Sequence, residues 1–239
     1  MNISSAIFEC SAPDLDSCPD ESLPEFAFIG RSNVGKSSLL NMLAGKEGLA
    51  RVSPTPGFTK LINMFIVDKI WRLVDLPGYG FAQVAREHSA RFNKSVSNYL
   101  RDRKNLTCVF TLIDSGLTPQ KIDLEFVEWL ARHSIPFVFV FTKIDKASPA
   151  EVQANIAAFT ACIAPWFETL PPVFTCSSNT REGRTELLGI IGECLAAIKE
   201  KAAQEPPDET TAPEETAAGG PKTKAKEARP KRPNPARPW

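Results

Sequence analysis

Several features that would narrow the function are missing from this sequence. Basic residues (Lys and Arg) and acidic residues (Asp and Glu) both number 28, so the formal net charge at pH 7 is zero. No global basic field therefore indicates a nucleic-acid partner. The six cysteines have no C-x-x-C spacing, which argues against a zinc site or a disulfide framework and favours a reducing cytosol.

The sequence also lacks segments that direct a chain to a membrane. Met1 is followed by Asn-Ile-Ser-Ser-Ala, with neither the basic region nor the long apolar region of a signal peptide. No apolar run reaches the length of about 18 residues that a membrane helix needs. With 43% apolar residues, the chain can still bury a sizeable core. We therefore expect a soluble, cytoplasmic protein.

Short apolar runs alternate with segments of helical periodicity along most of the chain. This alternation predicts a doubly wound α/β fold, with a mostly parallel sheet covered by helices on both faces. One pair of strands is joined only by Asp68-Lys69, too tightly for a crossover, so we predict that this pair is antiparallel. Strands are predicted at 6–10, 26–29, 62–67, 70–74, 106–113, 136–142 and 172–176, and helices from 38 and at 89–103, 119–133, 149–162 and 185–199.

The composition changes near residue 200. Residues 200–219 carry six acids against one lysine, whereas residues 220–239 carry seven bases against one acid. Such a segment cannot bury enough apolar surface to fold, so we predict an α/β domain over 1–200 and a disordered tail over 201–239. Two interpretations of the basic half stay open, an RNA-binding arm and a solvated extension. Its bases are Lys222, Lys224, Lys226, Arg229, Lys231, Arg232 and Arg237.

One stretch fits a phosphate-binding motif. Gly30-Arg31-Ser32-Asn33-Val34-Gly35-Lys36-Ser37 matches G-x-x-x-x-G-K-[ST], with an apolar strand before it and a helix after it. The two glycines let the backbone curl so that successive N–H groups point at a phosphate chain. Lys36 is placed to reach the β- and γ-phosphates, and the Ser37 hydroxyl to ligate Mg²⁺. This motif predicts a nucleoside triphosphate without specifying the base.

The base is predicted from Thr142-Lys143-Ile144-Asp145, at the carboxyl end of a strand, where open α/β sheets bind ligands. The Asp145 carboxylate can accept hydrogen bonds from N1–H and N2–H₂ of guanine, whereas adenine would leave it unpaired. The aliphatic stem of Lys143 can lie along the base. Cys176-Ser177-Ser178 follows the last strand and is placed to offer backbone N–H groups to guanine O6. Guanine is therefore favoured, and an ATP-using enzyme is the least favoured alternative.

Two further segments indicate a metal and a sensor of the γ-phosphate. Asp75-Leu76-Pro77-Gly78 ends a strand in D-x-x-G, so Asp75 would hold Mg²⁺ through a water and the Gly78 N–H would contact the γ-phosphate. A second hydroxyl ligand is predicted in the loop 51–60. Thr55 and Thr59 both lie within two residues of Gly or Pro there, and the residue types alone leave both open.

In their order along the chain, these motifs resemble those of the EngB family of bacterial GTPases in the Era-like group. The resemblance rests on Gly-Arg-Ser-Asn-Val-Gly-Lys-Ser-Ser, Thr-Pro-Gly-x-Thr, Asp-Leu-Pro-Gly-Tyr-Gly-Phe-Ala, Thr-Lys-x-Asp-Lys and x-Ser-Ser, and on segments 112–115 and 123–126. It implies that Thr59, rather than Thr55, is the switch threonine. Phe58 departs from the Arg or Lys usual in the family, which puts a basic contact from this loop in doubt. The resemblance also implies a role in large ribosomal subunit assembly and in cell division and septation.

Motifs and resemblance together predict three groups of site residues. The Mg²⁺ ligands are Ser37, Thr59 and Asp75. Lys36, Thr59 and Gly78 are the catalytic candidates. The nucleotide-binding set is Gly30, Arg31, Ser32, Asn33, Val34, Gly35, Lys36, Ser37, Ser38, Gly57, Phe58, Thr59, Lys60, Leu61, Asp75, Leu76, Pro77, Gly78, Thr142, Lys143, Ile144, Asp145, Cys176, Ser177 and Ser178.

The trigger of hydrolysis is not predicted by these motifs. Tyr79 stands where Ras-like GTPases carry the Gln that orients the attacking water. Tyrosine has no carboxamide, so we expect slow intrinsic hydrolysis that depends on a partner or an ion. In related Era-like GTPases an Asn at the position of Asn33 can help to bind K⁺; the other interpretation of Asn33 is a turn residue.

Two functions from different classes are compatible with this sequence. The preferred one is a monomeric GTP-hydrolysing switch that docks on precursors of the large ribosomal subunit, through rRNA and proteins. The alternative is a non-catalytic guanine-nucleotide-binding scaffold for division proteins.

Overall fold

The computed structural model describes residues 1–51, 61–79 and 86–204. A mixed seven-stranded sheet runs through the molecule in the order β1-β3-β4-β2-β5-β6-β7. Its strands are β1 (Ala6–Ala12), β2 (Glu25–Gly30), β3 (Ile62–Val67), β4 (Trp71–Asp75), β5 (Leu106–Asp114), β6 (Phe137–Thr142) and β7 (Val173–Thr175). The helices are α1 (Lys36–Ala44), α2 (Arg86–Asp102), α3 (Lys121–Arg132), α4 (Pro149–Ile163) and α5 (Arg184–Gln204).

The sheet is parallel from β4 through β2, β5 and β6 to β7, and antiparallel where β3 pairs with β4 and β1. Asp68 and Lys69 form the turn between β3 and β4, both with positive φ (48° and 60°). Two residues with positive φ produce the twist that a two-residue hairpin requires. The predicted doubly wound sheet with one tight antiparallel pair is therefore confirmed.

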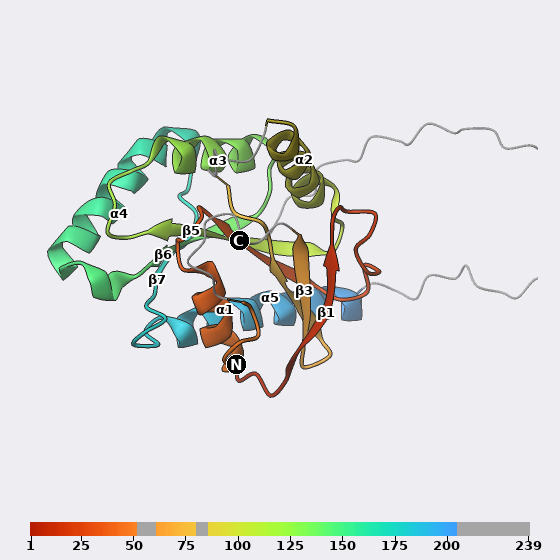
Figure 1. Ribbon diagram of the computed structural model, residues 1–239. Helices are drawn as coiled ribbons and strands as arrows, with labels where there is room; N and C mark the ends of the chain where they lie inside the picture. Colours follow the sequence, from red (N-terminus) through yellow and green to blue (C-terminus); the bar gives the residue numbers. More distant parts are fainter. Residues whose placement is uncertain (52–60, 80–85, 205–239) are drawn as a thin grey trace, which may run out of the picture.

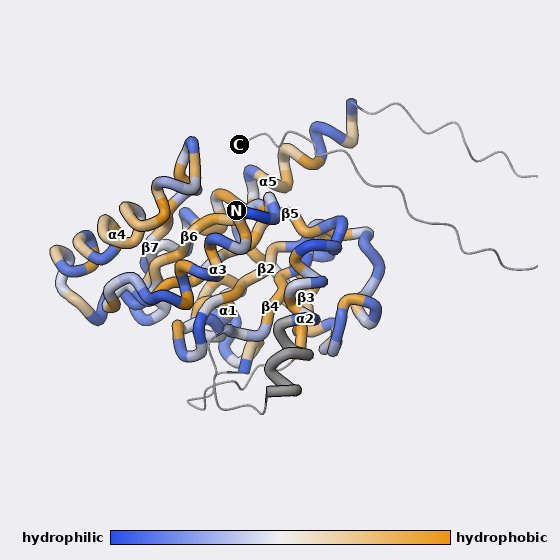
Figure 2. Tube along the Cα trace, turned by 90° about the horizontal axis from the view of Figure 1, so that it is seen from above, coloured by the Kyte–Doolittle hydropathy of each residue, from blue (hydrophilic) through white to orange (hydrophobic). Residues whose placement is uncertain are grey.

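The helices cover both faces of the sheet, with α1 and α5 on one face and α2, α3 and α4 on the other (Figure 1). Because successive residues of a strand point to opposite faces, Phe26 and Phe28 of β2 pack with α1 and α5. Ala27 and Ile29 pack with the helices of the other face. The hydropathy colouring shows the same layering, with apolar strands between helices that carry polar stretches (Figure 2). All six residues of β2 are buried, and the strand that leads into the phosphate motif lies in the middle of the sheet.

The amino end of β2, opposite the end that leads into the phosphate motif, is fixed by buried charges. Glu25 is fully buried and accepts hydrogen bonds from Arg103 (2.6 Å and 2.9 Å) and from the Tyr99 hydroxyl (2.7 Å). Arg72 of β4 lies 3.6 Å from the same carboxylate. Tyr99 belongs to α2, and Arg103 is the first residue after that helix. This network therefore ties the carboxyl end of α2 to the amino end of β2.

Some boundaries differ from those predicted. Helix α1 begins at Lys36, inside the phosphate motif, and α5 continues to Gln204, past the predicted end at residue 199. The alanines at 202 and 203 explain the extension, since Ala has the highest intrinsic helix propensity. Most of the predicted tail, at 205–239, and most of the loop 51–60 lie outside the described residues. Within the described part of the chain, no helix is long and apolar enough to cross a membrane.

Candidate functional site

The phosphate motif forms the connection between β2 and α1. Gly30 ends the strand where a Cβ would lie 2.7 Å from the Leu112 carbonyl oxygen, so no side chain fits there. Gly35 has a φ of 100°, a conformation that a residue with a Cβ rarely adopts. Asn33 also lies in the left-handed region, with a φ of 65°, which Asn tolerates better than most residues. The loop therefore curls directly into the amino terminus of α1, where helix N–H groups favour an anion.

Lys36, the first residue of α1, forms a buried ion pair with Asp75, the last residue of β4. The side chain of Asn63 donates a further hydrogen bond of 3.5 Å to the other carboxylate oxygen of Asp75. Ser37 follows Lys36 at the start of the helix and is half-buried. The lysine predicted for the phosphates and two predicted Mg²⁺ ligands thus lie together, and hydroxyl and carboxylate oxygens are ligands that suit Mg²⁺.

The loop after β4 lies against the phosphate motif. The Tyr79 N–H donates to the Gly30 carbonyl oxygen at 3.2 Å. A Cβ on Gly78 would lie 2.8 Å from the same Gly30 oxygen. Gly78 is therefore required for the close approach of the two backbones. Of the neighbouring segment predicted to bind nucleotide, Leu61 is exposed, and Gly57, Phe58, Thr59 and Lys60 lie outside the described residues.

The segment predicted to bind the base also touches the phosphate motif. The Thr142 hydroxyl donates to the Val34 carbonyl oxygen at 2.7 Å. The Lys143 ammonium donates to the Asn33 carbonyl oxygen at 2.7 Å and to the Asp114 carboxylate at 2.6 Å. Two segments about one hundred residues apart in the sequence are thus joined by direct hydrogen bonds.

Asp145 is held by the segment that follows β7. The side-chain amide of Asn179 donates to Asp145 Oδ2 at 2.8 Å, and the Ile144 N–H donates to the Cys176 carbonyl oxygen at 3.3 Å. Hydrogen bonds from Ser177 and then Asn179 lower the pKa of Asp145 from its ordinary value. Asp145 therefore remains an acceptor-only carboxylate at neutral pH.

The structure corrects part of the prediction for residues 176–178. The Cys176 N–H donates to the Phe141 carbonyl oxygen at 2.8 Å, and the Ser177 N–H donates to the Glu182 carbonyl oxygen at 3.1 Å. Both groups are used by the β6–β7 pairing and the local turn, so neither is free for a base. Ser178 is the remaining candidate of the three for a backbone contact to guanine O6.

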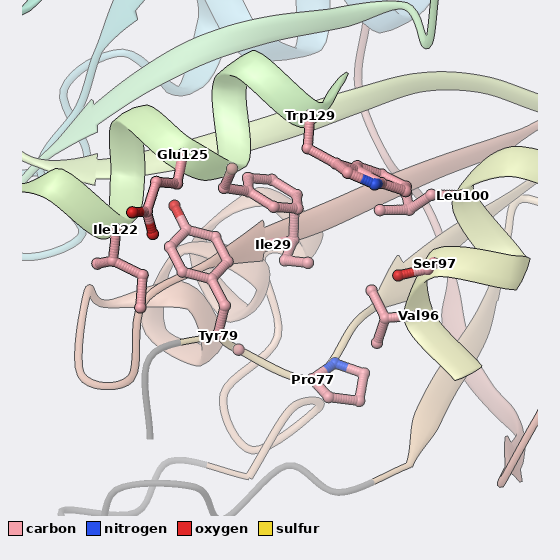
Figure 3. A pocket seen from close by; sticks show the side chains of 11 residues that line it. Ile29, Pro77, Tyr79, Val96, Ser97, Leu100, Ile122, Glu125 and Trp129 are labelled. Carbon is pink, nitrogen blue, oxygen red and sulfur yellow. The ribbon is translucent and has the colours of Figure 1, made fainter. Parts of the chain in front are cut away.

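The side chain of Tyr79 points to α3, toward Ile122 and Glu125 (Figure 3). Its ring stacks on Phe126 at a centroid distance of 4.5 Å. A pocket of about 340 Å³ lies beside this stack, between α2 and α3 and next to Pro77. The Tyr79 ring is thus part of the apolar packing against α3.

Asp123 links this tyrosine to the phosphate motif. Its Oδ2 lies 3.3 Å from Nε of Arg31, and its side chain is almost fully buried. Burial and then the Asp123 charge raise the pKa of Tyr79, and burial raises the pKa of Asp123. The buried Tyr79 hydroxyl interacts with the Asp123 carboxylate, and Asp123 in turn pairs with Arg31 of the phosphate motif.

Sequence reasoning assigned no role in the site to Asp114, Asp123 and Asn179. Each is an ordinary polar residue on its own, and only the fold brings it beside a motif residue. One local pattern could have indicated that Asp123 and Phe126 act together: they lie three residues apart, and so on one face of a helix.

The fold and this arrangement of loops define a P-loop GTPase. A family model described as "50S ribosome-binding GTPase" matches residues 25–143. A relative from Bacteroides fragilis described as "Probable GTP-binding protein EngB" is 49% identical over 191 residues, which are 80% of this chain and 95% of the relative. A relative of the same description from Phocaeicola vulgatus is 46% identical over 199 residues, covering 83% of this chain and all of the relative. The chain belongs to the EngB family of GTP-binding proteins.

Solved structures agree with this assignment. The crystal structure of a protein described as "a probable GTP-binding protein engB" matches with a TM-score of 0.57 and 27% identity, covering 72% of this chain and 99% of that one. Era in complex with MgGDPNP and a segment of 16S ribosomal RNA matches with a TM-score of 0.57 and 22% identity, covering 71% of this chain and 55% of that one. The second likeness shows the shared fold alone.

Proposed function

We propose that the protein binds GTP at this site and hydrolyses it to GDP, as a switch in the assembly of the large ribosomal subunit that is needed for normal cell division. The observation that supports the site is the set of hydrogen bonds that joins two other segments, the loop after β4 and the end of β6, to one phosphate motif. The Gly30 carbonyl oxygen accepts a hydrogen bond from the loop after β4. The Val34 and Asn33 carbonyl oxygens accept hydrogen bonds from the side chains of Thr142 and Lys143. Phosphate, metal and base recognition would converge there.

Each described group has a definite task in this proposal. The backbone N–H groups of residues 30–38 surround the phosphates, and Lys36 leaves Asp75 to stabilise charge on the β- and γ-phosphates. Asp145 accepts from the guanine edge, the stem of Lys143 covers the base, and the Ser178 N–H contacts O6. The Gly78 N–H contacts the γ-phosphate. Ile144, Leu76, Pro77 and Ser38 shape the backbone on either side of these groups.

GTPases of this family generally use Mg²⁺, and the oxygen groups of this site fit it. Ser37 and Asp75 would hold the ion, with Thr59 as the further ligand from outside the described residues. When bound, Mg²⁺ neutralises charge that develops on the phosphates during hydrolysis. Asn33 has the left-handed backbone of a turn residue, and its role in binding K⁺ remains a proposal of its own. Exchange of K⁺ for Na⁺ without a change in rate would contradict that role.

The position of Tyr79 supports slow intrinsic hydrolysis. Its ring is packed on Phe126, and a phenol has no carboxamide with which to orient water. We propose that a ribosomal precursor orders the loops 51–60 and 76–88 and so supplies the missing groups. The same packing is compatible with the second candidate, a non-catalytic guanine-nucleotide-binding scaffold for division proteins.

Single-turnover hydrolysis of GTP, with and without large-subunit precursor particles, separates these candidates. The switch requires a faster rate with the particles and cosedimentation that depends on GTP. The scaffold predicts a slow rate in both cases. Competition by GTP and GDP, but not ATP, for a labelled guanine nucleotide would exclude the ATP-using alternative.

We further propose that the protein acts in the cytoplasm as a monomer, with a GTPase domain up to about residue 200 followed by a tail. Because α5 includes residues up to Gln204, the RNA-arm interpretation is best tested by deleting residues 205–239, which removes none of the described part of that helix. An RNA arm predicts weaker particle binding and a smaller salt dependence after deletion. Unchanged binding with an unchanged salt dependence would leave the solvated extension.

A further inference from the structure

Asp114, the last residue of β5, divides its two carboxylate oxygens between two partners. Oδ1 accepts a hydrogen bond of 3.1 Å from the Gly116 N–H and so closes the turn that follows the strand. Oδ2 accepts one of 2.6 Å from the ammonium group of Lys143. The pairing of Asp114 with Thr142 in the β5–β6 register places Lys143 directly beside the carboxylate.

The ammonium group of Lys143 is thereby fixed from two sides. It donates to Asp114 of β5 and, at 2.7 Å, to the Asn33 carbonyl oxygen of the phosphate motif. A Cβ built on Gly35 would lie 3.8 Å from Cε of Lys143, so the end of the stem passes close to the motif. The backbone of Lys143 is left-handed, with a φ of 62°, which fixes the direction in which the side chain leaves the chain.

The neighbouring charges do not compete for this pair. The nearby acid Asp123 has its own cation, Arg31, at 3.3 Å. The side chains of Lys143 and Asp114 retain 34% and 17% of their exposure, so the pair is only partly desolvated. A free lysine side chain has many rotamers, and restricting them has an entropic cost that an anchored side chain has already met.

We propose that Asp114 is a positioning residue for base recognition: its carboxylate holds Lys143 extended, so that the methylene stem presents a fixed apolar surface to the guanine ring. This inference rests on the proposed binding of guanine nucleotide. Asp114 touches neither the phosphates nor the base in this proposal; it acts through Lys143. Its loss weakens contacts to the base and leaves contacts to the phosphates intact.

The test compares two ligands, GDP and inorganic tripolyphosphate, on the full chain with Asp114→Asn. The asparagine keeps an oxygen for the Gly116 N–H but removes the charge that holds Lys143. Charge-assisted hydrogen bonds are roughly twice as strong as neutral ones, and we expect the dissociation constant for GDP to rise about tenfold, with that for tripolyphosphate unchanged. The KM for GTP rises by a similar factor, whereas kcat at saturation is unchanged.

Two further variants make the outcome specific. In a Lys143→Met background, Asp114→Asn has no additional effect on GDP, because the group that it positions is already absent. Asp102→Asn removes a surface carboxylate that pairs with Arg101 at 2.9 Å and serves as the matched control, with unchanged affinity for both ligands.

Each other result overturns one identifiable claim. Wild-type protein that binds tripolyphosphate as tightly as GDP would contradict the proposed guanine site itself. Wild-type preference for GDP that survives Asp114→Asn undiminished would contradict the role of Asp114 alone. Equal weakening of both ligands would place its effect on the phosphate motif, through Asn33, and would also overturn the inference.

Discussion

Lys36 and Asp75 lie 39 positions apart in the sequence, yet they form an ion pair whose side chains are only 8% and 4% exposed. The pair joins the first residue of α1 to the last residue of β4, and therefore the phosphate motif to the D-x-x-G loop. In the proposed function, Lys36 contacts the phosphates and Asp75 helps to hold Mg²⁺ once the nucleotide binds. The ion pair keeps both charges compensated until then, because an isolated buried charge is costly.

The first prediction concerns the stability of this pair without nucleotide. Removing one member of a buried pair strands the other, so we expect Lys36→Met to lower the free energy of unfolding by about 3 kcal/mol. Asp75→Asn has a smaller effect, because its amide oxygen can still accept a hydrogen bond from the Lys36 ammonium. The double variant loses less than the sum of the two single losses. Urea denaturation of the four proteins measures this cycle, and strict additivity would show that the pair contributes nothing.

The second prediction compares Gly183, which lies just before α5, with Gly189, which lies within that helix. Gly183 has a φ of 80°, and a Cβ there would lie 2.1 Å from the Thr175 carbonyl oxygen. Gly183→Ala therefore displaces the segment that carries Ser177 and Asn179, and we expect both lower stability and weaker GDP binding. The matched control is Gly189→Ala within α5, where no atom lies within 4 Å of the added Cβ. This change raises the free energy of unfolding by about 0.5–1 kcal/mol.

Thermal unfolding and GDP titration of both glycine variants decide the matter. A Gly183→Ala protein that binds GDP as tightly as wild type would show that the turn before α5 does not position Asp145.

The sequence was sufficient to predict the order of the elements and the phosphate motif. These depend on local patterns, such as the fully buried run of β2 and the tight turn at Asp68-Lys69, which are visible in a single window of residues. The partners of the motif residues were not predictable in this way. Asp114 and Asn179 lie 29 and 34 residues from the motif residues that they hold, and only the strand order places them in contact.

The prediction for Cys176 also depended on a contact that a local sequence pattern cannot show. The residue type and its place after a strand suggested a free N–H group, but the exact register of β7 decides where that group points. With a register that pairs Phe141 with Thr175, the next N–H donates to the sheet. One residue of register separates a ligand contact from a sheet hydrogen bond.

The third prediction concerns pH and follows from the lowered pKa of Asp145. A carboxylate with a lowered pKa contributes stability above its ordinary pKa of 3.8, and the contribution is lost only as the pH falls through the lower folded value. Asp145 therefore stays ionised under mildly acidic conditions. We expect the contribution of Asp145, measured as the ratio of the wild-type affinity for GDP to that of Asp145→Asn, to be nearly constant between about pH 7.5 and about pH 5.

Calorimetric titration of GDP over this range tests the expectation, with Asp145→Asn weak at every pH as the reference. The opposite sign applies to Asp123, whose pKa is raised by burial. Its favourable contribution is complete below the unfolded pKa and is lost as the pH rises through the folded value. Because the pKa of Asp145 lies below 3.8, a loss of affinity that is centred above pH 5 as the pH falls would have to come from another group.

The fourth prediction concerns the thiols. All six cysteines are free, Cys162 is exposed, and Cys176 is fully buried with a pKa raised by burial to about 12. Because the thiolate is the reactive form, iodoacetamide at neutral pH should label Cys162 first and leave Cys176 unmodified in the folded protein. Mass spectrometry of peptides after timed quenching measures the order. Early labelling of Cys176 would show that the β6–β7 end opens readily.

The fifth prediction concerns Tyr79 and hydrolysis. Its hydroxyl is buried beside the Asp123 carboxylate, and its ring stacks on Phe126. We expect Tyr79→Phe to keep the stack and to hydrolyse GTP at the wild-type rate, because the hydroxyl does not take part in the chemistry. The hydroxyl interacts with the buried Asp123 carboxylate, so its removal leaves that carboxylate without this donor, and we expect the free energy of unfolding to fall by about 1–3 kcal/mol.

Tyr79→Ala distinguishes the ring from the hydroxyl. This variant loses the stack on Phe126 and the packing of Tyr79 against α3, and we expect a lower free energy of unfolding together with a smaller response to ribosomal precursors. Single-turnover rates of both variants, with and without the particles, are the measurement. A tenfold slower rate for Tyr79→Phe in the absence of particles would mean that the hydroxyl reaches the phosphates during turnover. Tyr79 would then have to leave Phe126 when GTP binds, and its place against α3 would be a resting position.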